Sequence, residues 1–420
     1  MTGPRARAVA LCAVLHGAAL LIPVHRVAAQ TQDEPGAAGP EAAGTPQMPP
    51  PAAVSASAWR WTVDATAFVG FNYQRRKFRD FDAWESQNWV MATGARPAGG
   101  GMLVLSSMMS LEPLTLRDIG SHQVFQTGET FRRAPLIDYQ HPHDLFMGLG
   151  AQFRRSLGRL AIVAAVDLVG APSLGPSAFM HRPSGRENPQ APLGHHHLDS
   201  SHITPGVVRG GIETGAWRME GSWFRGREPD ENRLDLDIGA LDSAAARLSW
   251  TRGPWSAQIS GAHLTEPEAI SPYDAKRLTA SIAYTSGSAA RGIDWLAAVG
   301  QSREAHGNLE SYLWEAAVRA GAATTLYIRA ESVAKDILDA GFHPRGTFHR
   351  HRQSQVGALT IGYIREVANT RAGRAGVGAD VTGYAVPPNL RDSYGSPLSF
   401  HVFLRYRAPR LSSGAPVHIH

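Results

Sequence analysis

Histidine and aspartate residues gather in one part of the chain, between residues 136 and 204. That part contains the stretches Gln-His-Pro-His-Asp-Leu-Phe, Met-His-Arg-Pro and Gly-His-His-His-Leu-Asp-Ser-Ser-His. Imidazole nitrogens and carboxylate oxygens together suit zinc, copper and nickel, and a His-x-His pair on extended backbone directs both rings to one side. We therefore expect a divalent transition-metal site, with zinc or copper as the cofactor. The candidate ligands are His141, His143, Asp144, His181, His195, His197 and His202.

The same residues also have a structural interpretation. Residues 141–144 read His-Pro-His-Asp, a combination that is common in turns whose side chains bond backbone groups. His196 and Asp199 would in that case help to pack a polar loop against the rest of the protein. The sequence leaves a metal site and a packed loop open as alternatives.

A second basic group lies between residues 343 and 352, where histidines and arginines are interspersed. Guanidinium and imidazolium groups pair well with phosphate oxygens, so this loop is a candidate for binding an anion or a lipopolysaccharide phosphate. A simple solvated basic loop is the alternative. The residues concerned are His343, Arg345, His349, Arg350, His351 and Arg352.

Catalytic motifs are missing from the sequence. It contains no Gly-x-Ser-x-Gly elbow, no P-loop and no His-Glu-x-x-His. Ser200 and Ser201 stand beside Asp199 and His202, which supplies the residue types of a hydrolase, but adjacency in sequence is not the geometry of a catalytic triad. We expect a protein that is not an enzyme, with a barrel hydrolase as the less favoured reading.

Most of the chain alternates between apolar and polar residues with a period of two. In residues 60–74, for example, apolar side chains at odd positions are interleaved with Arg, Thr, Asp, Asn and Gln. Because side chains alternate across a strand, each such segment has one apolar face and one polar face. Tight turns separate many of the segments, so about fourteen to sixteen strands are predicted. The pattern returns in residues 217–223, 247–260, 277–284, 326–331 and 398–406.

The polar face carries charges of both signs at strand centres. A dry core would exclude them, since an unpaired buried charge costs several kcal/mol. Tryptophan and tyrosine recur near strand ends, and long segments (117–142 and 171–205) alternate with tight turns, as in membrane barrels. We therefore predict an all-β fold: an antiparallel transmembrane β-barrel with its apolar face toward lipid. The central charges are Arg60, Asp64, Arg218, Glu220, Arg329, Glu331 and Asp380.

The chain divides into four parts. Residues 1–29 have a basic start, an apolar core and a small-residue cleavage site, which predicts a signal peptide. Residues 30–58 form a disordered Pro/Ala-rich leader, a passive spacer or a tether for a periplasmic partner. The barrel occupies residues 59–407, and residues 408–420 are a C-terminal extension. The single cysteine, Cys12, lies within the predicted signal, so no disulfide is expected.

These features resemble those of bacterial outer-membrane β-barrel proteins. The signal, the alternating strands and the last strand, residues 399–407, carry the resemblance, which is architectural. Such barrels usually finish on an aromatic residue, whereas this chain continues past Ala408, which implies an internal assembly signal at Phe403 or Tyr406. The Gln-His-Pro-His-Asp-Leu-Phe and Met-His-Arg-Pro stretches also resemble an uncharacterised family of outer-membrane proteins, and this adds a compartment without a mechanism.

The predicted function follows from a barrel with long loops. We expect an outer-membrane channel or transporter for a small polar solute or metal ion, with the histidine-rich loops partly occluding its lumen. The alternative is a non-conducting barrel that binds metal or has a structural role. Removal of the signal lowers the formal net charge from +5 to about +2, and no basic run is interleaved with aromatic residues, so no nucleic-acid partner is expected.

Overall fold

The structure is a computed structural model that describes most of the chain from Trp59 onward. The described residues are 59–116, 119–132, 134–269, 273–286, 290–305, 307–338, 352–409 and 411–412. The predicted signal peptide, the leader and the basic group at residues 343–351 lie outside them, as does most of the C-terminal extension.

Strands dominate the described residues. The strands are β1 (Arg60–Arg76), β2 (Arg79–Glu85), β3 (Asn88–Ala98), β4 (Gly101–Met109), β5 (Ser121–Phe131), β6 (Ala134–Gln140), β7 (Phe146–Leu157), β8 (Leu160–Gly170), β9 (Thr204–Thr214), β10 (Trp217–Phe224), β11 (Ser243–Arg252), β12 (Trp255–Leu264), β13 (Ala275–Thr285), β14 (Arg291–Glu304), β15 (Gly307–Ala320), β16 (Thr324–Lys335), β17 (Ser354–Thr370), β18 (Gly373–Ala385), β19 (Leu398–Arg407) and β20 (Leu411–Ser412). The short helices are α2 (Glu112–Thr115), α3 (His195–Leu198) and α4 (Arg391–Tyr394). No helix among the described residues is long and apolar enough to span a membrane.

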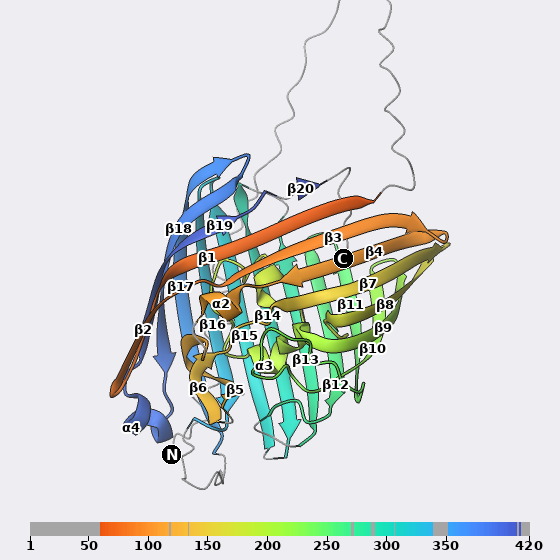
Figure 1. Ribbon diagram of the computed structural model, residues 1–420. Helices are drawn as coiled ribbons and strands as arrows, with labels where there is room; N and C mark the ends of the chain where they lie inside the picture. The colour runs from red at the N-terminus through yellow and green to blue at the C-terminus, as the bar shows by residue number, and fades with distance from the viewer. Residues whose placement is uncertain are drawn as a thin grey trace, which may run out of the picture. The chain divides into compact units, whose positions relative to one another are not determined.

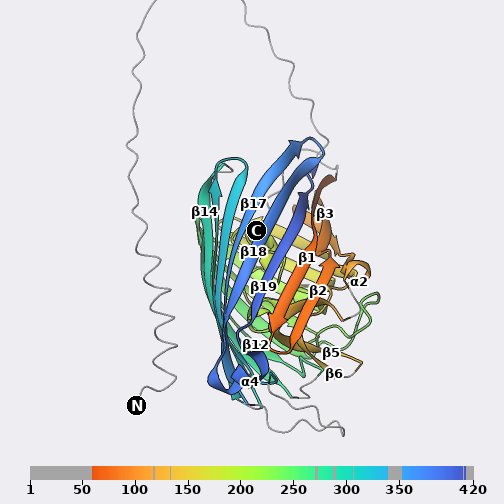
Figure 2. The same ribbon diagram turned by 90° about the vertical axis from the view of Figure 1, so that its left-hand side faces the viewer.

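The strands close into an antiparallel barrel. Its 18-stranded sheet contains two interrupted strands: β2 continues as β3 along the same neighbour, β1, and β20 extends β19. Counted in this way, the described residues form a barrel of 16 strands, and pairing of β1 with β19 closes it. The two strands lie side by side in Figure 2. The predicted fold class and strand number are confirmed.

The two ends of the barrel differ in the length of their connections. At one end the turns are tight, as at Gly215 and Gly253, whose backbone φ angles of 56° and 58° suit a residue without a Cβ. The same end holds the start of β1 and the end of β19. Long connections leave the other end, including residues 110–145, 171–203 and 225–242. Outer-membrane barrels have short periplasmic turns and longer extracellular loops, so the long connections mark the extracellular end.

The alternation in sequence becomes an outer and an inner face. Along β19, Leu398, Val402 and Leu404 are exposed on the exterior, while Ser399 and Arg405 are buried inside. Exposed leucine, isoleucine, valine and tryptophan side chains recur on the outward positions of the other barrel strands. Of the two aromatic residues at the end of β19, Tyr406 faces outward, whereas Phe403 packs inside.

Candidate functional site in the barrel lumen

The lumen contains a hairpin that enters from the extracellular end. We call residues 119–145, which include β5 and β6, the hairpin segment; Figure 1 shows it within the ring of strands. Its backbone bonds inward-facing side chains of β1: Asn72 donates to the carbonyl oxygen of His122 (2.9 Å), and the Val124 N–H donates to Gln74 (3.2 Å). These contacts hold the hairpin against the wall.

A second connection spans the lumen. We call residues 171–203 the crossing segment, because it leaves β8 and reaches the opposite wall. Near its start, the Ser173 N–H donates to a serine hydroxyl on β10 (2.9 Å). Farther along, Arg329 on β16 donates to the Gln190 carbonyl (2.7 Å), and Arg405 on β19 pairs with Glu187. Together the two segments form what we call the plug.

The two parts of the plug are bonded to each other. The Gln123 side chain donates to the Ala191 carbonyl oxygen (2.7 Å), and the Gln190 side chain donates to the His122 carbonyl oxygen (2.8 Å). A third bond joins Gln126 to the crossing segment. The plug is therefore one hydrogen-bonded unit, although its parts are far apart in sequence.

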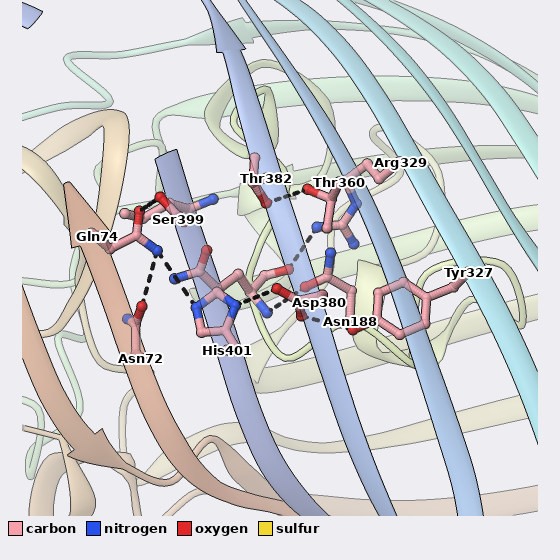
Figure 3. Close-up of polar contacts among 12 residues, drawn as sticks. Asn72, Gln74, Asn188, Tyr327, Arg329, Thr360, Asp380, Thr382, Ser399 and His401 are labelled. Carbon is pink, nitrogen blue, oxygen red and sulfur yellow. Dashed lines mark hydrogen bonds and ion pairs between the residues drawn. The ribbon is translucent and has the colours of Figure 1, made fainter. Parts of the chain in front are cut away.

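A polar network lines the wall formed by β1 and β16–β19 (Figure 3). The Asp380 carboxylate pairs with His401 Nδ1 (2.6 Å) and accepts a hydrogen bond from the Tyr327 hydroxyl (2.7 Å). The Gln74 amide contacts His401 Nε2 (3.5 Å) and donates to Asn72 (2.9 Å). Because the side chains bond one another across strands, this part of the wall is fixed by direct contacts.

Buried ion pairs tie the plug to the same side of the barrel. Arg182 pairs with Glu315 on β15 (2.7 Å) and with Asp199 in the plug. Although burial alone would lower its pKa, the two carboxylates raise the pKa of Arg182. Burial would raise the pKa of Glu187, but Arg407 and Arg405 lower it to about 2. Both side chains are therefore ionised at neutral pH.

Five imidazole side chains of the plug lie next to one another in a closed cycle. Their centroids are separated by 6.4 Å (His141–His143), 5.4 Å (His143–His202), 5.2 Å (His202–His195), 5.7 Å (His195–His196) and 6.0 Å (His196–His141). We call these five residues the histidine cluster. Two separate parts of the sequence supply it, and α3 contributes the adjacent pair.

Acceptor groups orient three of the five rings through Nδ1. His143 Nδ1 lies 2.9 Å from the Glu112 carboxylate, and His195 Nδ1 lies 2.7 Å from Asp199. His202 Nδ1 lies 2.8 Å from the backbone carbonyl oxygen of Asp199. Burial lowers the pKa of His195 to about 4 and the pKa of His202 well below its usual value, so both rings are neutral near pH 7.

The other two rings contact carboxylates. His141 Nε2 lies 3.0 Å from Glu129, and His196 Nδ1 lies 3.4 Å from Glu228. Burial opposes protonation of His141, but the Glu129 carboxylate outweighs it and raises the pKa of His141. These rings are engaged by acidic partners that the sequence does not associate with them.

The structure separates the remaining candidate ligands from the cluster. His197 Nδ1 lies 2.6 Å from the Ser311 hydroxyl on β15, and Asp144 pairs with Arg233 (3.2 Å). The His181 ring packs against Trp89, with centroids 5.0 Å apart, and burial lowers its pKa to about 4. Four of the seven candidates, His141, His143, His195 and His202, thus lie together.

Sequence reasoning missed the groups that hold the cluster. Glu112 and Glu129 come from the connection of residues 110–145, Glu228 and Arg233 come from that of residues 225–242, and none of them shares a motif with the histidines. His196 was noted but not proposed as a ligand. The sequence offers one weak signal for these partners: each acidic residue lies in a connection that leaves the extracellular end of the barrel, as the histidines do.

Three ligand atoms do not converge within the histidine cluster. Among the described residues, the group whose carboxylate or ring atoms all lie within 4.8 Å of one another is Asp230, Asp235 and Asp237. Those acids lie in the exposed connection after β10, where Asn232 donates to Asp235 and the Asp230 N–H donates to Asp237. The Asp199 carboxylate pairs with His195 and Arg182, and His202 contacts Asp199 only at its backbone carbonyl oxygen, so the carboxylate does not orient His202 as a hydrolase triad would require.

Two cavities lie beside the plug. One, of about 410 Å³, is lined by the ends of β4, β7 and β8 next to the long connections, and by Asp199 and His202. The other, of about 480 Å³, reaches the tight-turn end at Gly215 and Ala216. Pro176, Ser177 and His181 line both cavities, as does Arg247 on β11.

No family model and no curated protein matches the chain. Several solved structures do. An anion-selective porin from Comamonas acidovorans is 10% identical, with a TM-score of 0.49, over 84% of this chain and 99% of the porin. A loop-deletion mutant of OmpT, an outer membrane protein of Vibrio cholerae, is 10% identical, with a TM-score of 0.48, over 83% and 99%. A Rhodopseudomonas blastica porin mutant is 13% identical, with a TM-score of 0.40, over 83% and 99%.

The distribution of apolar and polar side chains over the barrel indicates its cellular location. A closed antiparallel barrel with apolar side chains outside and polar side chains inside is the structure that crosses the bacterial outer membrane. The chain is an outer-membrane β-barrel whose lumen is filled on one side by the plug and hollow on the other.

Proposed function

We propose that the protein is an outer-membrane channel for small polar solutes that pass along one side of the plug. The observation that carries the proposal is the pair of cavities. Between them they border the long-connection ends of β4, β7 and β8 and the tight-turn end of β9 and β10, and they share Pro176, Ser177 and His181. Volumes of about 410 and 480 Å³ suit a small solute.

The polarity of the cavities supports a hydrophilic solute. Arg247 and Glu220 line the larger cavity and pair with each other at 2.9 Å, and Arg218 pairs with the same carboxylate at 2.7 Å. The charges are matched within the wall, and serine side chains such as Ser249 and Ser281 lie among them. A polar solute therefore meets hydrogen-bonding groups in the larger cavity.

A non-conducting barrel is the second candidate, and one observation favours it. The plug bonds to itself and to the wall of β15–β19, and it also bonds the opposite wall, where the Gly175 N–H donates to Ser260 on β12 (2.8 Å). A non-conducting protein would bind a ligand or stabilise the envelope. We propose no catalytic role, because the residues that could form a triad are paired otherwise.

Single-channel recording in planar bilayers tests the proposal. Ser177 is exposed and lines both cavities, so Ser177→Trp places a large ring in the path and should reduce conductance at least about twofold. The matched control is Ile259→Trp, because Ile259 is 59% exposed on the exterior. It should leave conductance unchanged.

Two results would contradict the channel. A folded wild-type barrel without conductance would favour the non-conducting alternative. Equal conductance in wild type and in Ser177→Trp would show that ions do not pass Ser177, and it would contradict the proposed path along one side of the plug.

A further inference from the structure

Among the described residues, three buried ring nitrogens of the histidine cluster have no hydrogen-bond partner, and one of them, His196 Nδ1, faces the Glu228 carboxylate at 3.4 Å. The other two are Nε2 of His143 and Nε2 of His202. Only 5% of the surface of His143 is exposed. Buried polar atoms are nearly always paired, so a pair of orphaned nitrogens on adjacent rings calls for a ligand that the protein chain does not supply.

The hydrogen bonds at Nδ1 determine what these nitrogens can do. His143 Nδ1 faces the Glu112 carboxylate at 2.9 Å, and His202 Nδ1 faces the Asp199 carbonyl oxygen at 2.8 Å. A carboxylate and a carbonyl oxygen both accept, so Nδ1 of each ring is the donor in these contacts and Nε2 is the nitrogen that can offer a lone pair to a ligand. Metal-binding histidines have this arrangement, with the second nitrogen donating to a carboxylate or a backbone carbonyl.

The spacing of the rings fits a shared metal ion. With metal–nitrogen bonds of about 2.0–2.1 Å, two imidazoles in tetrahedral positions have ring centroids about 5 Å apart. The centroids of His143 and His202 are 5.4 Å apart. The ring of His195 lies 5.2 Å from that of His202, but no three nitrogens of the cluster lie within 4.8 Å of one another in the described residues.

The site borders open space. His202 lines the cavity of about 410 Å³ together with Asp199 and Ser201. This cavity can hold a hydrated ion beside the His202 ring, and its waters can supply the ligand positions that two imidazoles leave vacant.

We propose that His143 Nε2 and His202 Nε2 bind one divalent transition-metal ion, zinc or copper, with water as the remaining ligands and Glu112 as a positioning residue. The proposal narrows the seven candidates from the sequence to two. It does not depend on conduction, because the ligands belong to the plug and binding is measured without a membrane potential.

Copper binding to the full-length, tag-free protein in detergent micelles tests this site. We expect wild type to bind one Cu²⁺ whose electron paramagnetic resonance spectrum shows coupling to two imidazole nitrogens. His143→Gln and His202→Gln should each weaken binding at least about tenfold, and Glu112→Gln should weaken it less. The matched control is His263→Gln, which removes an exposed histidine paired with Asp274. It should bind copper like wild type.

Folding of each variant is checked by its heat-modifiable gel mobility. Unchanged copper affinity in both folded histidine variants would overturn the proposal, because the ion would then be held elsewhere. If those variants do not fold, the wild-type spectrum decides: coupling to fewer than two nitrogens would also overturn it. Channel activity has no bearing on either result.

Discussion

The two sides of the lumen satisfy their inward charges in different ways. On the side of β15–β19, which we call the packed side, Glu315 and Arg405 pair with Arg182 and Glu187 of the plug. On the side of β4 and β7–β13, which we call the hollow side, Glu220 pairs with arginines of its own wall. Ion pairs between wall and plug thus lie on the packed side, although that wall also contains the internal Asp380–His401 pair. The hollow side contacts the plug through neutral acceptors such as the Gly175 carbonyl oxygen, which accepts from Arg247 (3.0 Å).

Side-chain size reinforces this difference. Serines at inward positions of the hollow side, among them Ser106, Ser249 and Ser256, border the cavities. On the packed side, long charged side chains bond the plug: Lys335 reaches Gln126 (3.0 Å), and Glu331 accepts from the Gly194 N–H (3.4 Å). The position of the two cavities therefore depends on the inward-facing residues of the barrel as well as on the plug.

The largest expected effect comes from breaking the packed side at Arg182. Arg182→Met leaves the carboxylates of Glu315 and Asp199 without their main partner, and removing one member of a buried ionic group costs about 3–5 kcal/mol. We expect a lower free energy of unfolding in urea and a larger, noisier conductance as the plug loosens. Arg154→Met is the control, because Arg154 is 45% exposed in its pair with Glu213 and its loss should cost about 0–1 kcal/mol. A stable Arg182→Met variant with wild-type conductance would contradict a plug anchored by charge.

A smaller effect distinguishes the outer face from the hollow interior. Ile282 is 41% exposed on the exterior, so Ile282→Arg should cost about 2–4 kcal/mol in the bilayer, measured by folding into lipid vesicles. Val402→Arg on the packed side should have a similar cost, since Ile282 and Val402 both face lipid.

The control is a change at an inward position. The alternation alone offers Thr279→Arg as a tolerated control, but Thr279 is only 3% exposed and bonds Ser260. The better control is therefore Ser281→Arg, because Ser281 lines the larger cavity. The Ser281→Arg variant should fold normally. Equal cost at positions 281 and 282 would refute the assignment of faces.

The smallest effect concerns pH and the contact of the plug with β19. Because the pKa of Glu187 is lowered to about 2 in the folded protein, its contribution to stability is complete above the ordinary pKa of a glutamate. It is lost as pH falls from about 4.5 to about 2, by on the order of 1–3 kcal/mol. Unfolding free energies measured over that range should fall less steeply in Glu187→Gln. An identical slope in the variant would assign the acid sensitivity to other carboxylates.

The barrel is predictable from the sequence because its signal is local. Whether a residue such as Val402 faces lipid depends on its neighbours one and two positions away, which the sequence displays directly. Thr279 illustrates the limit: its inward direction is predictable, but its burial depends on Ser260 and on the plug, whose backbone N–H at Gly175 bonds that serine. The alternation along a strand predicts which side chains point into the lumen, but it does not predict which part of the plug packs against them.

The histidine cluster is only partly predictable for the same reason. The sequence identifies the residue types, and the fold brings His141 to His196 and His143 to His202. The carboxylates that orient the rings could not be assigned, because Glu112 reaches His143 across 31 positions of sequence. Selecting two candidate ligands required knowing which nitrogens were already bonded.

The crossing segment also has a consequence for the order of assembly. The pair of Glu187 and Arg405 joins residues 218 positions apart, and Arg405 belongs to the strand that closes the ring against β1. Contacts of such long range form late, because much of the chain must first be in place. Closing of the last seam and docking of the crossing segment are therefore expected to be one kinetic event, so that a barrel released before its seam is closed would also have an unseated plug.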